Sequence, residues 1–336
     1  AEGMSVDVRG RDEDAYPQGQ AWVDGEPVGA DLAFRLLYDY DAAAMVGDLW
    51  DLVPRLWLVL PLGALLILPG WLLLDLSGLR RQFDGGGQVA VAAGLSAALI
   101  PLLLLWTTTT GQRWSRPAVL IAAGLLVVVA AWRLVRGRPG RDPGPAADAG
   151  READWVSRAW PWALGGVFAL SLAVRLAMVR DLAVPAWVDS VHHSLIAQLI
   201  VDGGALPSTY EPFVSVDTAS YHAGFQSLVA AAHWLSGLDV AGAMLLVGQA
   251  LNALMVVAAY LLARELTGDR VLALVAALVV GLFSPMPAYY ASWGRYTQLA
   301  GLLILPAALV LAWRALPPRA VSYTHLRAHE TNDLIS

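Results

Sequence analysis

The sequence predicts an all-α polytopic membrane protein with about seven transmembrane helices and further helices at the exoplasmic surface. Hydrophobic residues make up 57% of the 336 residues, and charged residues only 15%. Seven apolar runs approach or exceed the roughly 18–20 residues that cross a bilayer core. The basic residues, all arginines, cluster in alternate connections between these runs, as is typical of membrane-spanning helices.

Residues 1–54 differ from the rest of the chain because they are strongly acidic. They contain twelve Asp or Glu residues and three Arg residues. The turn-like VDGEPVG and the strand-like DLAFRLLYDY predict a small water-exposed segment with β-strands. We interpret this segment as the end of a truncated exoplasmic domain.

The apolar spans are expected in two groups. A three-helix membrane segment occupies 55–135, and a membrane core with a long loop at 180–239 occupies 159–320. Between them, GRPGRDPGPAADAG gives 136–158 the composition of a flexible cytoplasmic linker. The expected spans are 56–75, 88–106, 117–135, 160–179, 240–263, 271–288 and 298–313.

Arginine placement predicts the orientation, because Lys and Arg are retained on the cytoplasmic side. Seven spans put the N-terminus and the 180–239 loop outside the plasma (inner) membrane, and the exceptions, Arg113 and Arg116, are few. Tyr221–Leu238 is nearly long enough to span, but we interpret it as a surface helix, since an eighth span would move later arginines outside. The arginines placed inside are Arg80, Arg81, Arg133, Arg136, Arg138, Arg141, Arg151, Arg158, Arg264, Arg270, Arg314 and Arg319.

Candidate chemistry concentrates in the 180–239 loop, which holds four of the six histidines. On a helix, Asp189, His192 and His193 share an arc with apolar residues, and Ser190 lies on the other side. This places titratable groups on the packed face. The alternative interpretation is that Asp189 is an N-cap and the histidines are polar groups at a helix end. The apolar residues of that arc are Leu195, Ile196, Leu199 and Ile200.

A second expected helix carries His222, Gln226 and His233 on one stripe. The alternative is interfacial anchoring, in which these histidines sit at headgroup level beside Trp234 and Tyr221. We favour anchoring for His233, and both interpretations stay open for His222. Asp and His groups can also bind a divalent metal, but no short ligand motif is present, so no metal site is assigned.

The third piece is SPMPAYYASWGRYTQ, on the same exoplasmic side. Arg295 lies there among aromatic residues that include Tyr296, and its planar guanidinium matches phosphate oxygens. The alternative is an aromatic belt with a snorkelling arginine. These residues complete the candidate site.

The order of these features resembles the GT-C membrane glycosyltransferases, which include the protein O-mannosyltransferases and the lipid A aminoarabinose transferases. The resemblance covers roughly Trp160 to Ala320. It rests on LAVRLAMVRD, then PAWVDSVHHSLIAQLIVDGGALP, then WLSGLD, YLLARELTGDR and SPMPAYY. One departure is that the family often has two adjacent acidic residues where this chain has Asp189 and Ser190.

The resemblance implies glycosyl transfer from a polyprenyl-phosphate sugar donor to an exoplasmic glycan, lipid or protein acceptor, with the bilayer as a partner. Asp189 is implied to be the general base, which contributes typically about 10²–10⁴-fold. No cofactor is assigned, although a divalent metal is compatible, and the net charge of −6 argues against nucleic-acid binding. The residues expected to contact substrate are His192, His193, His222, Arg295 and Tyr296.

The rival class is a non-enzymatic membrane protein, either a transporter or a scaffold for envelope assembly, and an inactive homologue is a third alternative. Transporters place polar groups near the bilayer midplane. Here the spans offer mainly Gln249 and Asn252, which we interpret as hydrogen-bonding between helices.

Residues 321–336 are expected to be a non-native tail. From Val321 to about Thr331 they resemble a translated sequencing-adapter read-through. On that interpretation the membrane core continues beyond Ala320, and His325 and His329 have no part in the site.

Overall fold

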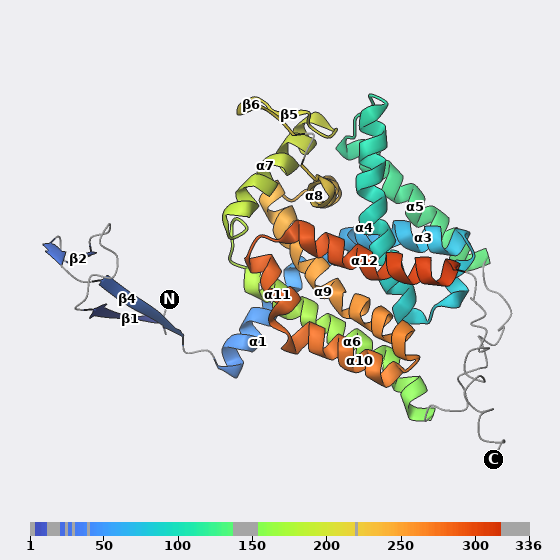
Figure 1. Ribbon diagram of the computed structural model, residues 1–336, viewed down its shortest axis with the longest axis horizontal. Helices are drawn as coiled ribbons and strands as arrows, with labels where there is room; N and C mark the ends of the chain where they lie inside the picture. Colours follow the sequence, from blue (N-terminus) through green and yellow to red (C-terminus); the bar gives the residue numbers. More distant parts are fainter. Residues whose placement is uncertain are drawn as a thin grey trace, which may run out of the picture. The chain divides into compact units, whose positions relative to one another are not determined.

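The computed structural model describes residues 4–11, 21–23, 26–28, 31–38, 41–136, 154–218 and 221–316. Its contacts divide the chain into two compact units, Ala1–Pro54 and Arg55–Ser336 (Figure 1). This division falls where the sequence changes from acidic to apolar. Most of the predicted linker at 136–158 and the whole predicted tail at 321–336 lie outside the described residues.

The N-terminal unit contains β-structure, as predicted. Strand β1 (Met4–Arg11) pairs antiparallel with β4 (Asp31–Tyr38), and β2 (Ala21–Val23) pairs with β3 (Glu26–Val28). The strand-like DLAFRLLYDY supplies β4. Helix α1 (Ala42–Trp50) follows, and the Asp41 carboxylate caps it by accepting from the Ala44 amide at 2.8 Å.

The second unit is a helical bundle. Among the described residues, seven segments are long and apolar enough to cross a membrane, which confirms the all-α polytopic prediction. The spans are Val53–Leu76, Gly85–Thr109, Arg116–Arg136, Arg158–Val179, Val240–Thr267, Arg270–Ser292 and Tyr296–Ala315. The elements are η1 (Val53–Leu58), α2 (Val59–Leu66), α3 (Leu68–Leu76), η2 (Leu79–Gln82), α4 (Gly85–Thr109), α5 (Arg116–Arg136), α6 (Asp154–Val179), α7 (Val188–Gly203), β5 (Thr209–Tyr210), β6 (Val214–Asp217), α8 (Gly224–Ser236), α9 (Val240–Thr267), α10 (Arg270–Leu278), η3 (Val279–Phe283), α11 (Pro285–Ser292) and α12 (Tyr296–Ala315).

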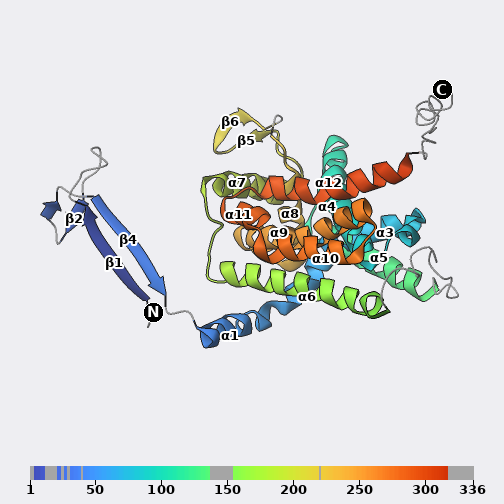
Figure 2. The same ribbon diagram turned by 60° about the horizontal axis from the view of Figure 1, so that its bottom comes forward.

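Helix α9 is the centre of this bundle. It packs against α4, α6, α8, α10 and α12, and nearly every residue from Val240 to Leu261 is buried. In Figure 2, α6, α9, α10 and α12 run along one another. The peripheral α5 instead exposes Ile121, Leu125 and Val128. A helix that is apolar on its outer face suits contact with lipid rather than water. Helices from both predicted membrane segments therefore pack into one unit.

One end of the bundle gathers the arginines that the sequence places in the cytoplasm. There, three carboxylates are each held by arginine, and Arg314 also donates to the Gln82 carbonyl at 2.5 Å. Asp75 contacts Arg80 and Arg133 at 3.1 and 2.8 Å, Asp84 contacts Arg264 and Arg270 at 3.5 and 3.9 Å, and Glu265 contacts Arg314 at 2.6 Å. These pairs join the ends of six spans: the first to the third, and the second, fifth, sixth and seventh to one another.

The two exceptional arginines lie at the opposite end and have local roles. Arg113 donates to the Gly203 carbonyl at 2.9 Å, at the C-terminus of α7. Arg116 lies against Gly237, which ends α8. Cations are stabilising at helix C-termini, where carbonyl groups are left without helical partners. The structure thus gives a local reason for arginines that depart from the predicted distribution.

Helix α8 differs from the predicted surface helix. It is not among the spanning segments, as expected, because its 13 residues rise only about 20 Å. However, Phe225 to Ala232 are all buried, and the helix packs against α4, α7 and α9. Its small residues, such as Ala230 and Ala231, allow this close packing. It is therefore a short internal helix rather than one with a free face.

Candidate functional site

The start of α7 is unusual in its backbone. Trp187 is the N-cap residue, with φ 76° and ψ 154°, and it makes no side-chain capping bond. This is a region that residues other than glycine rarely occupy, and it costs about 1–3 kcal/mol. Asp189 lies one residue inside the helix and caps nothing, so the N-cap interpretation of Asp189 is wrong. Its carboxylate is left free to act on other groups.

The buried face of α7 is turned relative to the predicted arc. Ser190, His193, Ile196 and Ile200 are buried, with Ser190 only 1% and His193 only 3% exposed. The prediction put Ser190 on the polar side, and this is wrong. Two neighbours, α8 and α9, set the buried face, and the small Ser190 hydroxyl is satisfied by the Ala186 carbonyl. His193 therefore lies at the centre of the packed face, and His192 lies at its edge.

The structure brings Asp189 and Arg295 together. The turn between α11 and α12 approaches the first turn of α7, and an Arg295 Nη1 to Asp189 Oδ2 distance of 3.7 Å results. Gly294 makes this approach possible: its φ is +70°, and a Cβ there would lie 3.0 Å from the Ser190 Oγ. Both charged side chains remain nearly half exposed, 42% for Asp189 and 45% for Arg295. The ion pair is thus open to a ligand.

Arg295 also lies over an aromatic ring, with its guanidinium carbon 4.7 Å from the centroid of Trp293. The Trp293 ring in turn packs 5.8 Å from the ring of Tyr289. These contacts fit the aromatic-belt interpretation in part. The ion pair adds a second role, because a merely snorkelling arginine needs no carboxylate.

Histidines and tyrosines surround the ion pair on one side. The His192 Nε2 lies 2.8 Å from the Tyr210 hydroxyl, and the His192 ring centroid lies 4.5 Å from that of Tyr221. The His193 Nδ1 lies 2.8 Å from the Gln226 Nε2. Burial, helped by the neighbouring His192, lowers the pKa of His193 to about 4. His193 is therefore neutral near pH 7, with an Nδ1 that accepts from the Gln226 amide.

Tyr296 is buried more deeply than a simple substrate contact requires. It is 1% exposed and stacks on Phe225 with centroids 5.0 Å apart, while the His193 ring lies 6.5 Å away. Gly248 leaves room for this ring, because a Cβ there would lie 2.3 Å from it. Tyr296 therefore joins the histidine cluster to the core.

The predicted stripe on the second helix is not formed. His222 precedes α8, is exposed, and contacts the Tyr221 ring with centroids 4.6 Å apart. His233 donates from its ring to the Leu238 carbonyl at 2.7 Å, at the far end of α8. Gln226 instead turns towards His193. The anchoring interpretation suits His233, whereas His222 lies at the rim of the cluster.

Tyr210, Tyr221 and Gln226 were not among the expected substrate contacts, although Gln226 was placed on the stripe with His222 and Tyr221 was named beside the histidines. Gln226 carried a signal, since it is a single amide in the otherwise apolar GFQSLVAAA, and such an amide needs a partner when buried. Tyr210 carried none, because its position depends on how β5 folds back over α7. Among the described residues, no group of three or more His, Asp or Glu side chains is placed to hold a metal ion.

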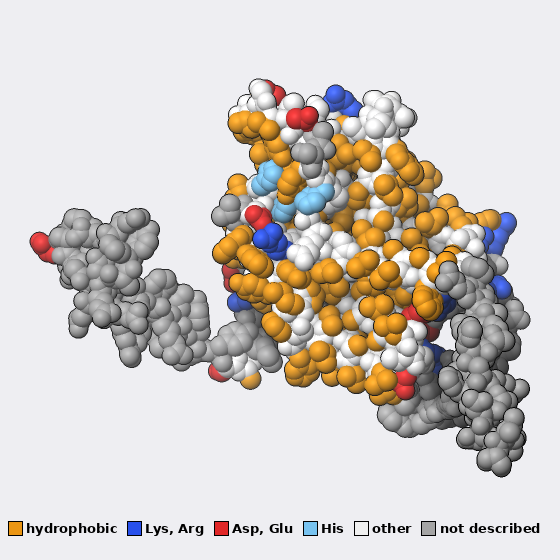
Figure 3. Space-filling model, in the orientation of Figure 1, with side chains coloured by type: hydrophobic (Ala, Val, Ile, Leu, Met, Phe, Trp, Pro, Cys, Tyr) orange, Lys and Arg blue, Asp and Glu red, His pale blue; other side chains and the backbone are white. Residues whose placement is uncertain are grey.

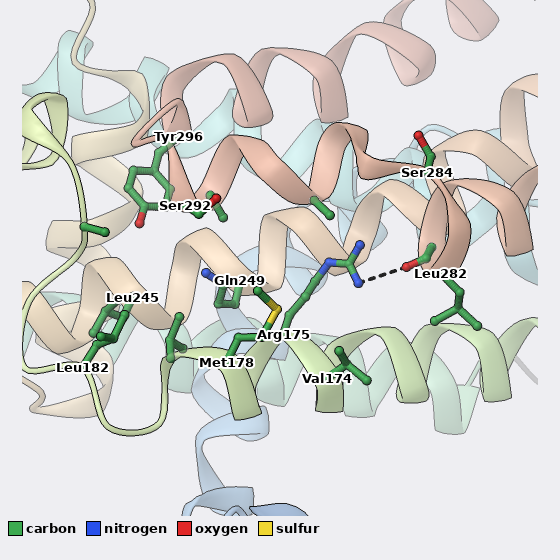
Figure 4. A pocket seen from close by; sticks show the side chains of 15 residues that line it. Val174, Arg175, Met178, Leu182, Leu245, Gln249, Leu282, Ser284, Ser292 and Tyr296 are labelled. Carbon is green, nitrogen blue, oxygen red and sulfur yellow. Dashed lines mark hydrogen bonds between the residues drawn. The ribbon is translucent and has the colours of Figure 1, made fainter. Parts of the chain in front are cut away.

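Figure 3 shows histidine side chains beside an acidic and a basic side chain, above a broad hydrophobic surface. Next to this site is a cavity of about 220 Å³ (Figure 4). It is lined by α6, the loop before α7, α9, η3, α11 and α12, and it reaches Ala186 and Tyr296. The cavity thus connects the neighbourhood of Asp189 with the apolar interior.

Comparisons with known proteins give a family but no activity. The profile of a family described as "Family of unknown function (DUF6541)" matches residues 63–328. The match ends inside the segment predicted to be a foreign tail, and that prediction stays open. No curated protein and no solved structure matches the chain. Because the matched region covers most of the sequence, the chain belongs to this family of unknown function, DUF6541.

Proposed function

We propose that the protein is a membrane glycosyltransferase that moves a sugar from a polyprenyl-phosphate donor to an exoplasmic acceptor. The observation that carries this proposal is the meeting of Asp189 and Arg295. These residues come from segments more than one hundred positions apart, and both remain accessible in an open ion pair. A carboxylate and a cation side by side suit a reaction that removes a proton and releases a phosphate.

In the proposed reaction, the Asp189 carboxylate takes the proton from the acceptor hydroxyl. The acceptor oxygen then forms a bond to the anomeric carbon, and the bond between that carbon and the phosphate oxygen breaks. The electron pair leaves with the lipid phosphate. Arg295 orients the Asp189 carboxylate and places positive charge beside the reacting atoms, where a preorganised cation is most effective. At 3.7 Å apart, the two groups are near enough for one acceptor hydroxyl beside them to contact both.

The neighbouring rings suit sugar recognition. Tyr210, Tyr221 and His192 offer hydroxyl and imidazole groups that can donate to or accept from sugar hydroxyls. A neutral His193 holds the first turn of α7 by its bond to Gln226 without adding a competing charge. His222 lies at the exposed rim, and we expect it to contact the acceptor.

The proposed orientation puts this site on the exoplasmic side of the plasma (inner) membrane and the arginine-rich end in the cytoplasm. The chain has no cysteine, so single cysteines can be labelled cleanly. Val191 and Ser77 are both exposed and lie at opposite ends. An impermeant maleimide should label Val191→Cys in intact cells, and Ser77→Cys only after permeabilisation. The reverse labelling pattern would show that the proposed orientation in the membrane is wrong.

Activity is tested by following the loss of a radiolabelled polyprenyl-phosphate sugar in membranes that contain the protein. Asp189→Asn should lower turnover roughly 10²-fold or more, since asparagine cannot take the acceptor proton. Asp202→Asn is the matched control, because Asp202 lies on the same helix but only bonds Gln198 at 2.8 Å. Wild-type turnover in the Asp189→Asn protein would rule out Asp189 as the base. Absence of transfer by the wild-type protein would reject the proposal itself.

A further inference from the structure

The cavity beside the site contains a buried arginine that the proposed reaction has not used. Arg175 lies about one turn from the end of α6, is 5% exposed, and lines the cavity. Its Nε donates to Asn252 Oδ1 at 2.7 Å, and its Nη1 donates to Ser171 Oγ and to the Gly281 carbonyl at 2.6 and 3.0 Å. Asn252 in turn donates to the Ala288 carbonyl at 3.0 Å, so Arg175 is held at a junction of α6, α9, η3 and α11.

These bonds satisfy only part of the guanidinium. Arginine carries five N–H donors, and within the described part of the chain none of the bonds to Arg175 involves Nη2. In Figure 4 this second terminal nitrogen points away from the bond to Gly281, towards the ribbon of α11. All the partners are neutral, and no carboxylate of the described residues pairs with Arg175. The positive charge is therefore left uncompensated.

An uncompensated arginine inside a membrane span is costly, by about 2.5–3.5 kcal/mol at the bilayer centre on the lower scales and by less towards the ends, and such residues mark binding or transport sites. The cavity walls indicate what kind of ligand would balance it. Met178 is 66% exposed, Val174 42% and Leu282 37%, although all three line the cavity. The cavity is therefore bordered by apolar side chains on the outer surface, where lipid lies. A ligand with one anionic group and a long apolar chain fits both features.

We propose that Arg175 binds the phosphate of the lipid donor in this cavity, with the polyprenyl chain leaving over Met178 and Leu282. This inference rests on the proposed glycosyl transfer for the identity of the lipid. Tyr296 and Ala186 line the same cavity, so the sugar of a donor held at Arg175 would extend from there towards the first turn of α7. A phosphodiester donor carries one negative charge, and the phosphate monoester that leaves carries a second when ionised. A fixed guanidinium suits that change, because its planar donors match phosphate oxygens.

The test measures binding by the purified full chain in detergent, using a short polyprenyl monophosphate, the polyprenol of equal length, and phosphatidylglycerol. Arg175→Gln should weaken polyprenyl monophosphate binding roughly tenfold or more and leave polyprenol binding unchanged. Arg113→Gln is the matched control, since Arg113 lies at the same end outside the cavity and should bind as wild type. Wild-type affinity in a folded Arg175→Gln protein overturns the proposal.

Two further measurements keep the outcome decisive. If Arg175→Gln does not fold, Met178→Trp fills the cavity from an exposed position and should also abolish binding; unchanged affinity there overturns the assignment. If the protein binds phosphatidylglycerol as tightly as polyprenyl monophosphate, the assignment of the lipid donor as the ligand of this cavity is wrong. Asp189→Asn should bind polyprenyl monophosphate normally while losing turnover. A phosphate site that depends on Arg175 in a protein without transferase activity would reject the reaction but leave the binding site intact.

Discussion

The two ends of the membrane unit use the same residue types in opposite ways. At the arginine-rich end, Asp84 lies between Arg264 and Arg270, and Glu265 pairs with Arg314 at 2.6 Å. The acidic side chains there are only 14% and 18% exposed. At the α7 end, Asp189 meets one arginine at 3.7 Å, and both side chains are nearly half exposed.

This difference separates a structural cluster of charges from a candidate site. The arginine-rich end is closed, and the α7 end is open. At the closed end, each carboxylate contacts arginine, and Asp84 Oδ2 also accepts from the Tyr260 hydroxyl at 2.8 Å. The side chains of Asp75, Asp84 and Glu265 are 11–18% exposed, against 42% for Asp189, so they offer a ligand less accessible surface. At the open end, Asp189 and Arg295 keep accessible edges that a ligand can use. Exposure and accessible donors or acceptors, rather than the number of charges, therefore distinguish the candidate site.

The largest stability effect is expected at the closed end. Asp84→Asn removes the carboxylate shared by Arg264, Arg270 and Tyr260. Removing one partner of a fully buried ion pair costs roughly 3–5 kcal/mol, and these side chains are 14–22% exposed, so the loss should lie at or below the lower end of that range. Asn keeps the N-cap of α4, so the loss reports the charge. Thermal unfolding of the purified protein in detergent measures the effect. Asp189→Asn should change the melting temperature little, and a loss as large as that of Asp84→Asn would remove the distinction between the two ends.

The next effect is a pH dependence at the open end. Because burial lowers the folded pKa of His193 to about 4, its contribution to stability is complete above about pH 6.5 and is lost as pH falls towards 4. The full loss is roughly 3 kcal/mol. The charged forms of His192 and His222 lower this pKa further, and Asp189 opposes them. Melting temperature should therefore fall below pH 6.5 in the wild-type protein.

His193→Gln separates this contribution from other titrating groups. The variant should lose part of the wild-type slope of melting temperature between pH 6.5 and 4. His192→Gln is the matched control, since His192 lies at the half-buried edge of α7 and its removal should keep most of the slope. If melting temperature falls with pH equally in the wild-type and His193→Gln proteins, His193 is not buried in its neutral form.

The smallest effect is expected from the turn that carries Arg295. Gly294→Ala places a Cβ at φ +70°, 3.0 Å from the Ser190 Oγ and 3.3 Å from the Asp189 Cβ, and should cost about 1–2 kcal/mol. Activity should fall with it, because the turn moves away from Asp189. Gly301→Ala in α12 meets nothing within 4 Å and should be neutral or stabilising by about 0.5–1 kcal/mol. If both variants behave alike, the close approach of this turn is not needed.

Much of the fold could be predicted because bilayer thickness imposes a length that is visible in the sequence. The seven spans follow from apolar runs, and the strand DLAFRLLYDY from its residue types. The candidates Asp189 and Arg295 could also be identified from the sequence, since charged residues are rare near these spans. Their contact could not be predicted, because it depends on the turn at Gly294, and no local pattern encodes the approach of that turn to α7.

The side-chain arrangement was predicted less well. Helical periodicity on α7 correctly placed His193, Ile196 and Ile200 on the buried face, but it put Ser190 on the polar side, and packing against α8 and α9 buries that residue. Arg175 shows the same limit: its position in a span was visible, whereas its neutral partners on α9 and η3 and the cavity beside it depend on segments distant in the sequence. Tertiary packing decides which polar groups are satisfied and which are free.

The burial of α8 has a consequence for how the protein is made. A helix of 13 residues is too short to leave the insertion machinery as an independent span, yet its residues end up enclosed by α4, α7 and α9. The seven long helices can enter the bilayer one after another during synthesis. The segment from α7 to α8 can then take its place only after α4 and α9 are both in the membrane, so the candidate site is completed at the last stage of assembly.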